Sequence, residues 1–250
     1  MMSLARISLG GAVKQQYLFK LRAYANLFVS LVAVQIIALL FTTGGMVGMS
    51  GMGSEYLDLE IRFYSGAILF VFTALWIAVN AFVLTLPLSR HVDFSFVTNR
   101  LSSNLANFGF LVTAAVAGGV TVSLGSLLLR NVLYYTGGGS SLIIGANFLV
   151  RPDELLTGAA VGSLYLLLFG AAGYLAGALI QLHRSLYVLL PALVLGVLFY
   201  EAAHEQLRLL QVINFYRLEA LPILFILKIV SSVLLLWSGA ALLSNRTEIG

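Results

Sequence analysis

The sequence predicts an all-α membrane protein whose helices cross the bilayer several times. Hydrophobic residues make up 60% of the 250 residues, charged residues make up 10%, and the mean hydropathy is +0.99. Soluble domains carry about 25% charged residues, so this chain has too few charged residues to cover the surface of a soluble domain. The apolar residues also gather in runs of about 20, the length of a helix that crosses the roughly 30 Å hydrocarbon layer.

Six apolar runs are expected to be the spans of a single transmembrane domain. Their approximate limits are 26–47, 64–86, 107–129, 155–180, 186–200 and 221–243. The fifth run is short for a crossing and contains Pro191. Charged and apolar residues mix in the segment 201–220, which we expect either to lie on the outer surface or to re-enter the membrane. Re-entrant backbone needs cover from protein or a wet cavity.

The first 24 residues form a basic segment before the spans. Their charged residues are Arg6, Lys14, Lys20 and Arg22. Because apolar side chains recur at helical spacing from Val13 onward, we expect segment 1–24 to be an amphipathic helix in the inner interface. Its basic side is expected to face the lipid headgroups, and a disordered basic tail is the alternative.

Basic residues predict the orientation of the spans. The segments expected inside carry eight bases and two acids, whereas those expected outside carry five bases and eight acids. Bases flank spans mainly on the cytoplasmic side, so both termini are expected in the cytoplasm, with the protein in the cell membrane. The bases lie between apolar runs and do not gather on one soluble face, so no nucleic-acid partner is expected.

The polar segment 89–104 stands between the second and third spans, on the expected cytoplasmic side. Phe94, Val97 and Leu101 fall at helical spacing within it, which predicts a short amphipathic helix. A soluble partner could push on the membrane part through this helix. An interfacial connector with no partner is the alternative.

Three polar side chains interrupt the apolar runs: Gln35, Asn80 and Lys228. The two amides are expected to form hydrogen bonds between helices, and Lys228 to extend toward the outer interface. The alternative is that they line a substrate pathway. The fourth span also carries two GxxxG pairs, at 158–162 and 173–177, which favour close helix packing and only weakly indicate a dimer.

Glu201 and His204 are the main candidates for chemistry, as an intramembrane metal-dependent enzyme would require. Their i, i+3 spacing places them on one helix face, with Glu205 as the only further ligand nearby. A zinc site needs more ligands, and no nucleophile motif is present. We therefore expect no catalytic residue, bound cofactor or metal on this chain.

Three stretches resemble the permease subunits of type-2 ATP-binding-cassette exporters. VKQQYLFKLRAYANLF is similar to the entry helix and first span of that family, DFSFVTNRLSSNLAN to its coupling helix, and EALPILFILKIVSSVLLLWSGAALLSNRTE to its last span and basic tail. The likeness covers most of the chain as a layout. The short fifth span followed by 201–220 is similar to the re-entrant outer helices of that class.

The resemblance implies a transport function. The chain has no Walker A sequence, so a separate cytoplasmic ATPase with ATP and magnesium would dock on the coupling segment. The coupling residues would be Arg90, Asp93, Phe94, Phe96, Val97, Arg100 and Leu101. Two permease chains, identical or paralogous, would form the export pathway for an amphipathic substrate such as a peptide antibiotic, a lipid or a drug. A non-transporting sensor or assembly subunit is a further alternative.

Overall fold

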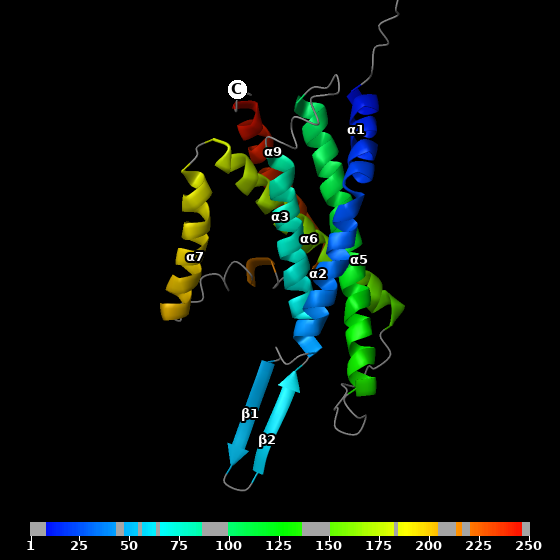
Figure 1. Ribbon diagram of the computed structural model, residues 1–250, viewed down its shortest axis with the longest axis vertical. Helices are drawn as coiled ribbons and strands as arrows, with labels where there is room; N and C mark the ends of the chain where they lie inside the picture. The colour runs from blue at the N-terminus through cyan, green and yellow to red at the C-terminus, as the bar shows by residue number, and fades with distance from the viewer. Residues whose placement is uncertain are drawn as a thin grey trace, which may run out of the picture. The chain divides into compact units, whose positions relative to one another are not determined.

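The protein is almost entirely helical in its described residues (Figure 1). The computed structural model describes residues 9–43, 48–54, 57–63, 66–86, 100–136, 151–182, 185–204, 214–216 and 221–246. The helices are α1 (Leu9–Ala23), α2 (Ala25–Thr43), α3 (Ala67–Thr85), α5 (Arg100–Thr136), α6 (Pro152–Ile180), α7 (Leu186–His204) and α9 (Pro222–Arg246). The predicted all-α class is therefore confirmed.

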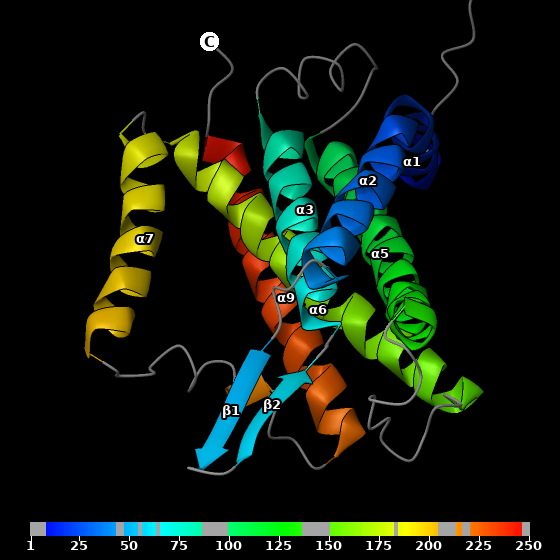
Figure 2. The ribbon, with the colours of Figure 1, turned by 60° about the horizontal axis from the view of Figure 1, so that its bottom comes forward.

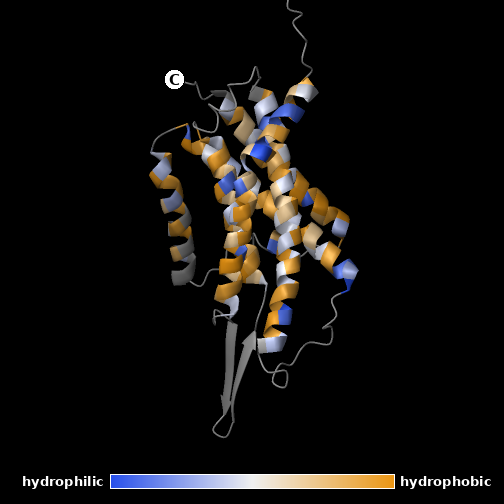
Figure 3. Cartoon of the chain, turned by 45° about the vertical axis from the view of Figure 1, so that its right-hand side comes forward, coloured by the Kyte–Doolittle hydropathy of each residue, from blue (hydrophilic) through white to orange (hydrophobic). Residues whose placement is uncertain are grey.

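Among the described residues, five helices are long and apolar enough to cross a bilayer. They cover Ala25–Thr43, Ala67–Thr85, Leu101–Tyr135, Pro152–Ile180 and Pro222–Ser244. Hydrophobic residues make up much of their length, as the colouring in Figure 3 shows, and many of these residues are exposed, with Val29 at 69% and Leu235 at 72%. Apolar surface of this extent is stable only against lipid or another protein. The chain is a multi-pass membrane protein.

The remaining expected span, 186–200, lies within α7. This helix has 19 residues, includes Pro191, and ends in the charged turn that holds Glu201 and His204. Its apolar part is shorter, Leu186–Val197. Five of the six expected spans thus correspond to helices of spanning length.

The chain packs as two compact units, and the division between them falls within α3, α5 and α6. The first unit comprises Met1–Arg22, Ile77–Val112 and Leu167–Gly250. The second unit comprises Ala23–Trp76 and Thr113–Leu166.

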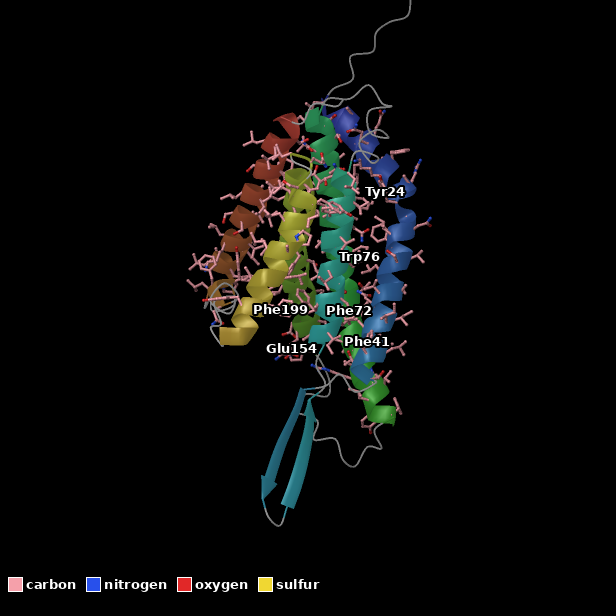
Figure 4. All side chains as sticks on the ribbon, turned by 60° about the vertical axis from the view of Figure 1, so that its left-hand side comes forward. Tyr24, Phe41, Phe72, Trp76, Glu154 and Phe199 are labelled. Atoms are coloured by element: carbon pink, nitrogen blue, oxygen red, sulfur yellow. The ribbon has the colours of Figure 1, made fainter. Side chains whose placement is uncertain are left out.

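The core of the second unit is built by α2, α3 and α5. Ala38, Leu69 and Val122 are buried together. The rings of Phe41 and Phe72, labelled in Figure 4, lie 5.7 Å apart and join α2 to α3. Leu39, Ile68, Phe70 and Phe72 pack against the three buried residues, so apolar side chains fill the space between the helices.

Helices α5 and α6 approach each other backbone to backbone in the second unit. A Cβ added to Gly119 would lie 2.7 Å from the carbonyl oxygen of Ala159, and one added to Gly162 would lie 3.8 Å from the Cα of Gly119. The closest backbone approach is therefore at Gly119, whereas a Cβ on Gly158 or Gly162 would make only ordinary van der Waals contacts.

The second glycine pair packs against α3 in the first unit. A Cβ on Gly173 would lie 2.8 Å from the Cα of Ala78, and one on Gly177 would lie 3.0 Å from the carbonyl oxygen of Phe82. The 173–177 pair therefore explains a close approach of α6 to α3 inside the chain.

A β-hairpin lies between α2 and α3, although the sequence predicts an all-α protein. Strand β1 (Gly48–Ser54) pairs antiparallel with β2 (Leu57–Phe63), with Gly48 opposite Phe63 and Ser54 opposite Leu57 (Figure 2). The sequence of β2, LDLEIRF, alternates apolar and charged residues, which is the period-2 pattern of a strand. This strand pattern covers only seven residues between two long apolar runs, and the strand was not predicted from the sequence.

Candidate functional site

Helix α1 covers the second part of the predicted amphipathic segment and buries one of its bases. Lys14 and Arg22 are exposed, as expected of side chains near headgroups. Lys20, however, is only 2% exposed, and Gln16 on the same face is 3% exposed. The prediction that the basic side of this helix faces the headgroups is therefore wrong for Lys20.

Lys20 is buried because it belongs to a chain of hydrogen bonds in the first unit. Its ammonium donates to Oδ1 of Asn107. Nδ2 of Asn107 donates to the hydroxyl of Tyr174 at 3.1 Å, and that hydroxyl donates to Oδ1 of Asn104 at 2.9 Å. We call these four residues the buried polar network. A buried charge is costly unless hydrogen bonds replace its water, and the network supplies one here.

The buried polar network joins three helices within the first unit. Lys20 comes from α1, Asn104 and Asn107 from the first two turns of α5, and Tyr174 from α6. None of the four is more than 6% exposed. Hydrogen bonds in such a low-dielectric interior are strengthened, so the network holds the three helix segments to one another.

The expected coupling segment 89–104 is described only from residue 100 onward. Residues 100–104 form the start of α5, so the expected break before the third span at residue 107 does not occur. Leu101 is about half exposed, whereas Ser102, Ser103 and Asn104 are buried. The helix continues because this turn packs inward on the protein.

The other predicted coupling residues cannot be placed. They are Arg90, Asp93, Phe94, Phe96 and Val97, which lie outside the described residues, as does the side chain of Arg100. The same holds for Glu205 and for the side chains of Glu201 and His204.

Gln35 forms the hydrogen bonds between helices that were expected of it. Its Nε2 donates to Oγ1 of Thr121 at 2.8 Å and to Oγ1 of Thr73 at 3.3 Å, which links α2 to α5 and α3. Nearby in the same unit, Nε1 of Trp76 donates to Oγ of Ser30 at 2.9 Å. Gln35 is thus a packing residue of the second unit.

Replacing Gln35 by leucine is expected to weaken the second unit modestly. Interhelical hydrogen bonds in membranes contribute about 0.6 kcal/mol each, so the loss of two should lower the melting temperature by roughly 2–5 °C. Thr43→Val in the same helix removes a hydroxyl that donates to carbonyl oxygens of its own helix, at Leu39 and Leu40, and should change little. Thermal unfolding in detergent measures both, and equal effects would contradict the interhelical role.

Lys228 is held by the short helical segment 214–216. Its Nζ donates to the carbonyl oxygen of Phe215 at 2.8 Å and lies 3.9 Å from the centre of the Phe215 ring. Tyr216 adds a contact between its hydroxyl and Ser232, 3.0 Å apart. A carbonyl and an aromatic face together accommodate the cation. Asn80, the third predicted pathway residue, is half-buried in the first unit.

Sequence reasoning missed Asn104, Asn107 and Tyr174. A usable signal was present, because two amides three residues apart at the start of an apolar helix share a face that must find polar partners. No protein-family description, curated protein or solved structure matches the chain. Its function is therefore argued from this geometry.

Proposed function

We propose that this chain is the membrane-spanning permease subunit of an ATP-binding-cassette exporter. A separate cytoplasmic ATPase would supply the energy, and two permease chains, identical or paralogous, would form the pathway. Both termini would lie in the cytoplasm and the spans in the cell membrane. The exported substrate would be amphipathic, such as a peptide antibiotic, a lipid or a drug.

The buried polar network is the observation that supports this proposal. It ties α1, the counterpart of the entry helix, to the turn of α5 that ends the segment 89–104. An ATPase pushing on 89–104 would therefore move α1 and the bonded part of α6 together with the start of α5. Rigid displacement of packed helices is the kind of motion on which alternating access depends.

The decisive experiment removes the apolar side of the coupling segment. The triple variant Phe94→Ala, Val97→Ala, Leu101→Ala should lose ATPase association about tenfold or more, because apolar anchors dominate such interfaces. The readouts are co-purification of a Walker A-containing ATPase and ATP-driven uptake of an amphipathic dye by inside-out vesicles. Wild-type association and uptake in the triple variant, with the protein still folded, would refute the proposal.

Matched controls separate this effect from loss of apolar surface in general. Val29, Val32 and Ile36 are exposed apolar residues of α2. Their triple alanine variant should keep ATPase association. Metal analysis of the purified chain tests the enzyme alternative, which predicts about one bound zinc per chain.

A further inference from the structure

A pocket of about 280 Å³ lies in the second unit among α3, α5 and α6. Its apolar wall includes Phe70, Val122, Leu127 and Leu155. The ring of Phe70 is fixed from behind by an edge contact with Tyr165, with centroids 6.4 Å apart. This volume is close to the lower end of the range for ligand pockets, roughly 300–1,000 Å³, so it suits one segment of a chain-like molecule.

Two hydroxyls in the wall are already engaged. Oγ of Ser123 donates to the carbonyl oxygen of Leu155 at 3.1 Å, and Oγ of Ser126 donates to that of Val122 at 3.0 Å. Because these hydroxyls already donate to backbone carbonyls, a bound molecule need not supply an acceptor for them. The interior therefore favours an aliphatic chain over a polar one.

The pocket also has two charged residues of opposite sign. Arg130 lies near the end of α5, and Glu154 lies in the first turn of α6, where Figure 4 labels it. Both side chains are exposed, and neither makes an ion pair with another residue that the structure describes. The neighbouring Arg151 and Asp153, by contrast, pair with each other at 3.2 Å.

The order of these residues along the helices matches the order of groups in a lipid. The charges stand toward the helix ends, where a membrane helix meets the polar interface. Leu127 is one turn deeper in α5, and Gly158 is one turn deeper in α6. A molecule with its head at the interface and its chain in the bilayer would meet charge first and apolar wall second.

We infer that this pocket binds one acyl chain of phosphatidylethanolamine, with the headgroup between Arg130 and Glu154. A guanidinium binds a phosphate through paired hydrogen bonds, and a carboxylate accepts hydrogen bonds from a primary ammonium. The headgroup carries both partners in one molecule. A trimethylammonium head has no hydrogen to donate to Glu154, and a glycerol head has no cation. This site would exist whether or not the chain transports a substrate.

Lipid retention by the full-length chain tests the inference. The purified protein is equilibrated with equal amounts of phosphatidylethanolamine, phosphatidylcholine and phosphatidylglycerol, and native mass spectrometry counts the retained lipids. The wild type should prefer phosphatidylethanolamine about tenfold, as one charge-assisted hydrogen bond allows. Glu154→Gln should abolish that preference. Arg130→Gln should lower the retention of all three lipids.

Control variants use the neighbouring ion pair and one residue of the pocket lining. Arg151→Gln and Asp153→Asn, outside the pocket lining, should leave the preference unchanged. Gly158→Leu should fill the pocket, since a Cβ there has its nearest neighbour 3.7 Å away, whereas Ala160→Leu adds similar bulk at an exposed position outside the pocket lining. Equal retention of the three lipids by the wild type, or an unchanged preference in Glu154→Gln, overturns the inference. Either result leaves ATPase association untouched and so does not bear on the proposed function.

Discussion

Gly119→Ala is expected to destabilise the second unit strongly, although alanine is the better helix former. The new Cβ would lie 2.7 Å from the carbonyl oxygen of Ala159 and 2.7 Å from the backbone nitrogen of Ser163. Both neighbours are helix backbone and cannot rotate away, so α5 and α6 must separate. Overpacking of this kind costs about 1–3 kcal/mol, which lowers the melting temperature by roughly 5–10 °C.

Gly158→Ala on the facing helix is the matched control. Its added Cβ would meet only Oγ of Ser123 at 3.7 Å, an ordinary van der Waals distance. Alanine is favoured over glycine inside a helix by about 1 kcal/mol, so this variant should melt at the wild-type temperature or slightly above. Thermal unfolding of the two purified variants in detergent should therefore move in opposite directions. A shift of both melting temperatures in the same direction would contradict the close contact between Gly119 and the backbone of α6.

Tyr174→Phe is expected to break the buried polar network with the loss of a single oxygen. That oxygen accepts from Asn107 and donates to Asn104, so both amides would be left with an unsatisfied buried group. Each such group costs about 1–3 kcal/mol, so the two together cost about 2–6 kcal/mol, and the melting temperature should fall by roughly 5–20 °C. If the network carries motion from the coupling segment, transport should fall about tenfold while ATPase association persists.

Tyr187→Phe is the control for this variant. Tyr187 lies in α7 of the same unit and is 65% exposed, so its loss of a hydroxyl should change neither stability nor transport. Lys20→Met offers an independent test, because it removes the donor to Asn107 from the other end of the network. A Tyr174→Phe protein with the wild-type melting temperature and transport rate would show that the network is not used.

The sequence predicted best what depends on local pattern. The length of the apolar runs identified the helices. The amide of Gln35, alone in a hydrophobic run, was expected to form hydrogen bonds with other helices. Lys20 was misplaced because its partner Asn107 is 87 positions away, and periodicity shows which side chains share a face but not what that face meets. A basic residue in an interfacial helix ordinarily seeks headgroups, and only tertiary packing reversed that preference.

The boundary of α5 was missed for a related reason. Polar residues such as Ser102, Ser103 and Asn104 read as a connector, yet they are buried and continue the helix. For Asn104 the polarity reflects the hydrogen bond from Tyr174 of α6 within the network. The pocket of the second unit was equally hidden, because its residues Arg130 and Glu154 lie on different helices and are far apart in the sequence.

The length of α5 has a mechanical consequence. Its 37 residues extend about 55 Å at 1.5 Å per residue, whereas a bilayer with its headgroups is about 40–45 Å thick. Even at the average tilt of about 20°, a helix of this length outreaches the bilayer. The length of α5 that lies in water then depends on membrane thickness. A thick, ordered bilayer would cover more of the helix ends, and a thin bilayer would leave more of them in water.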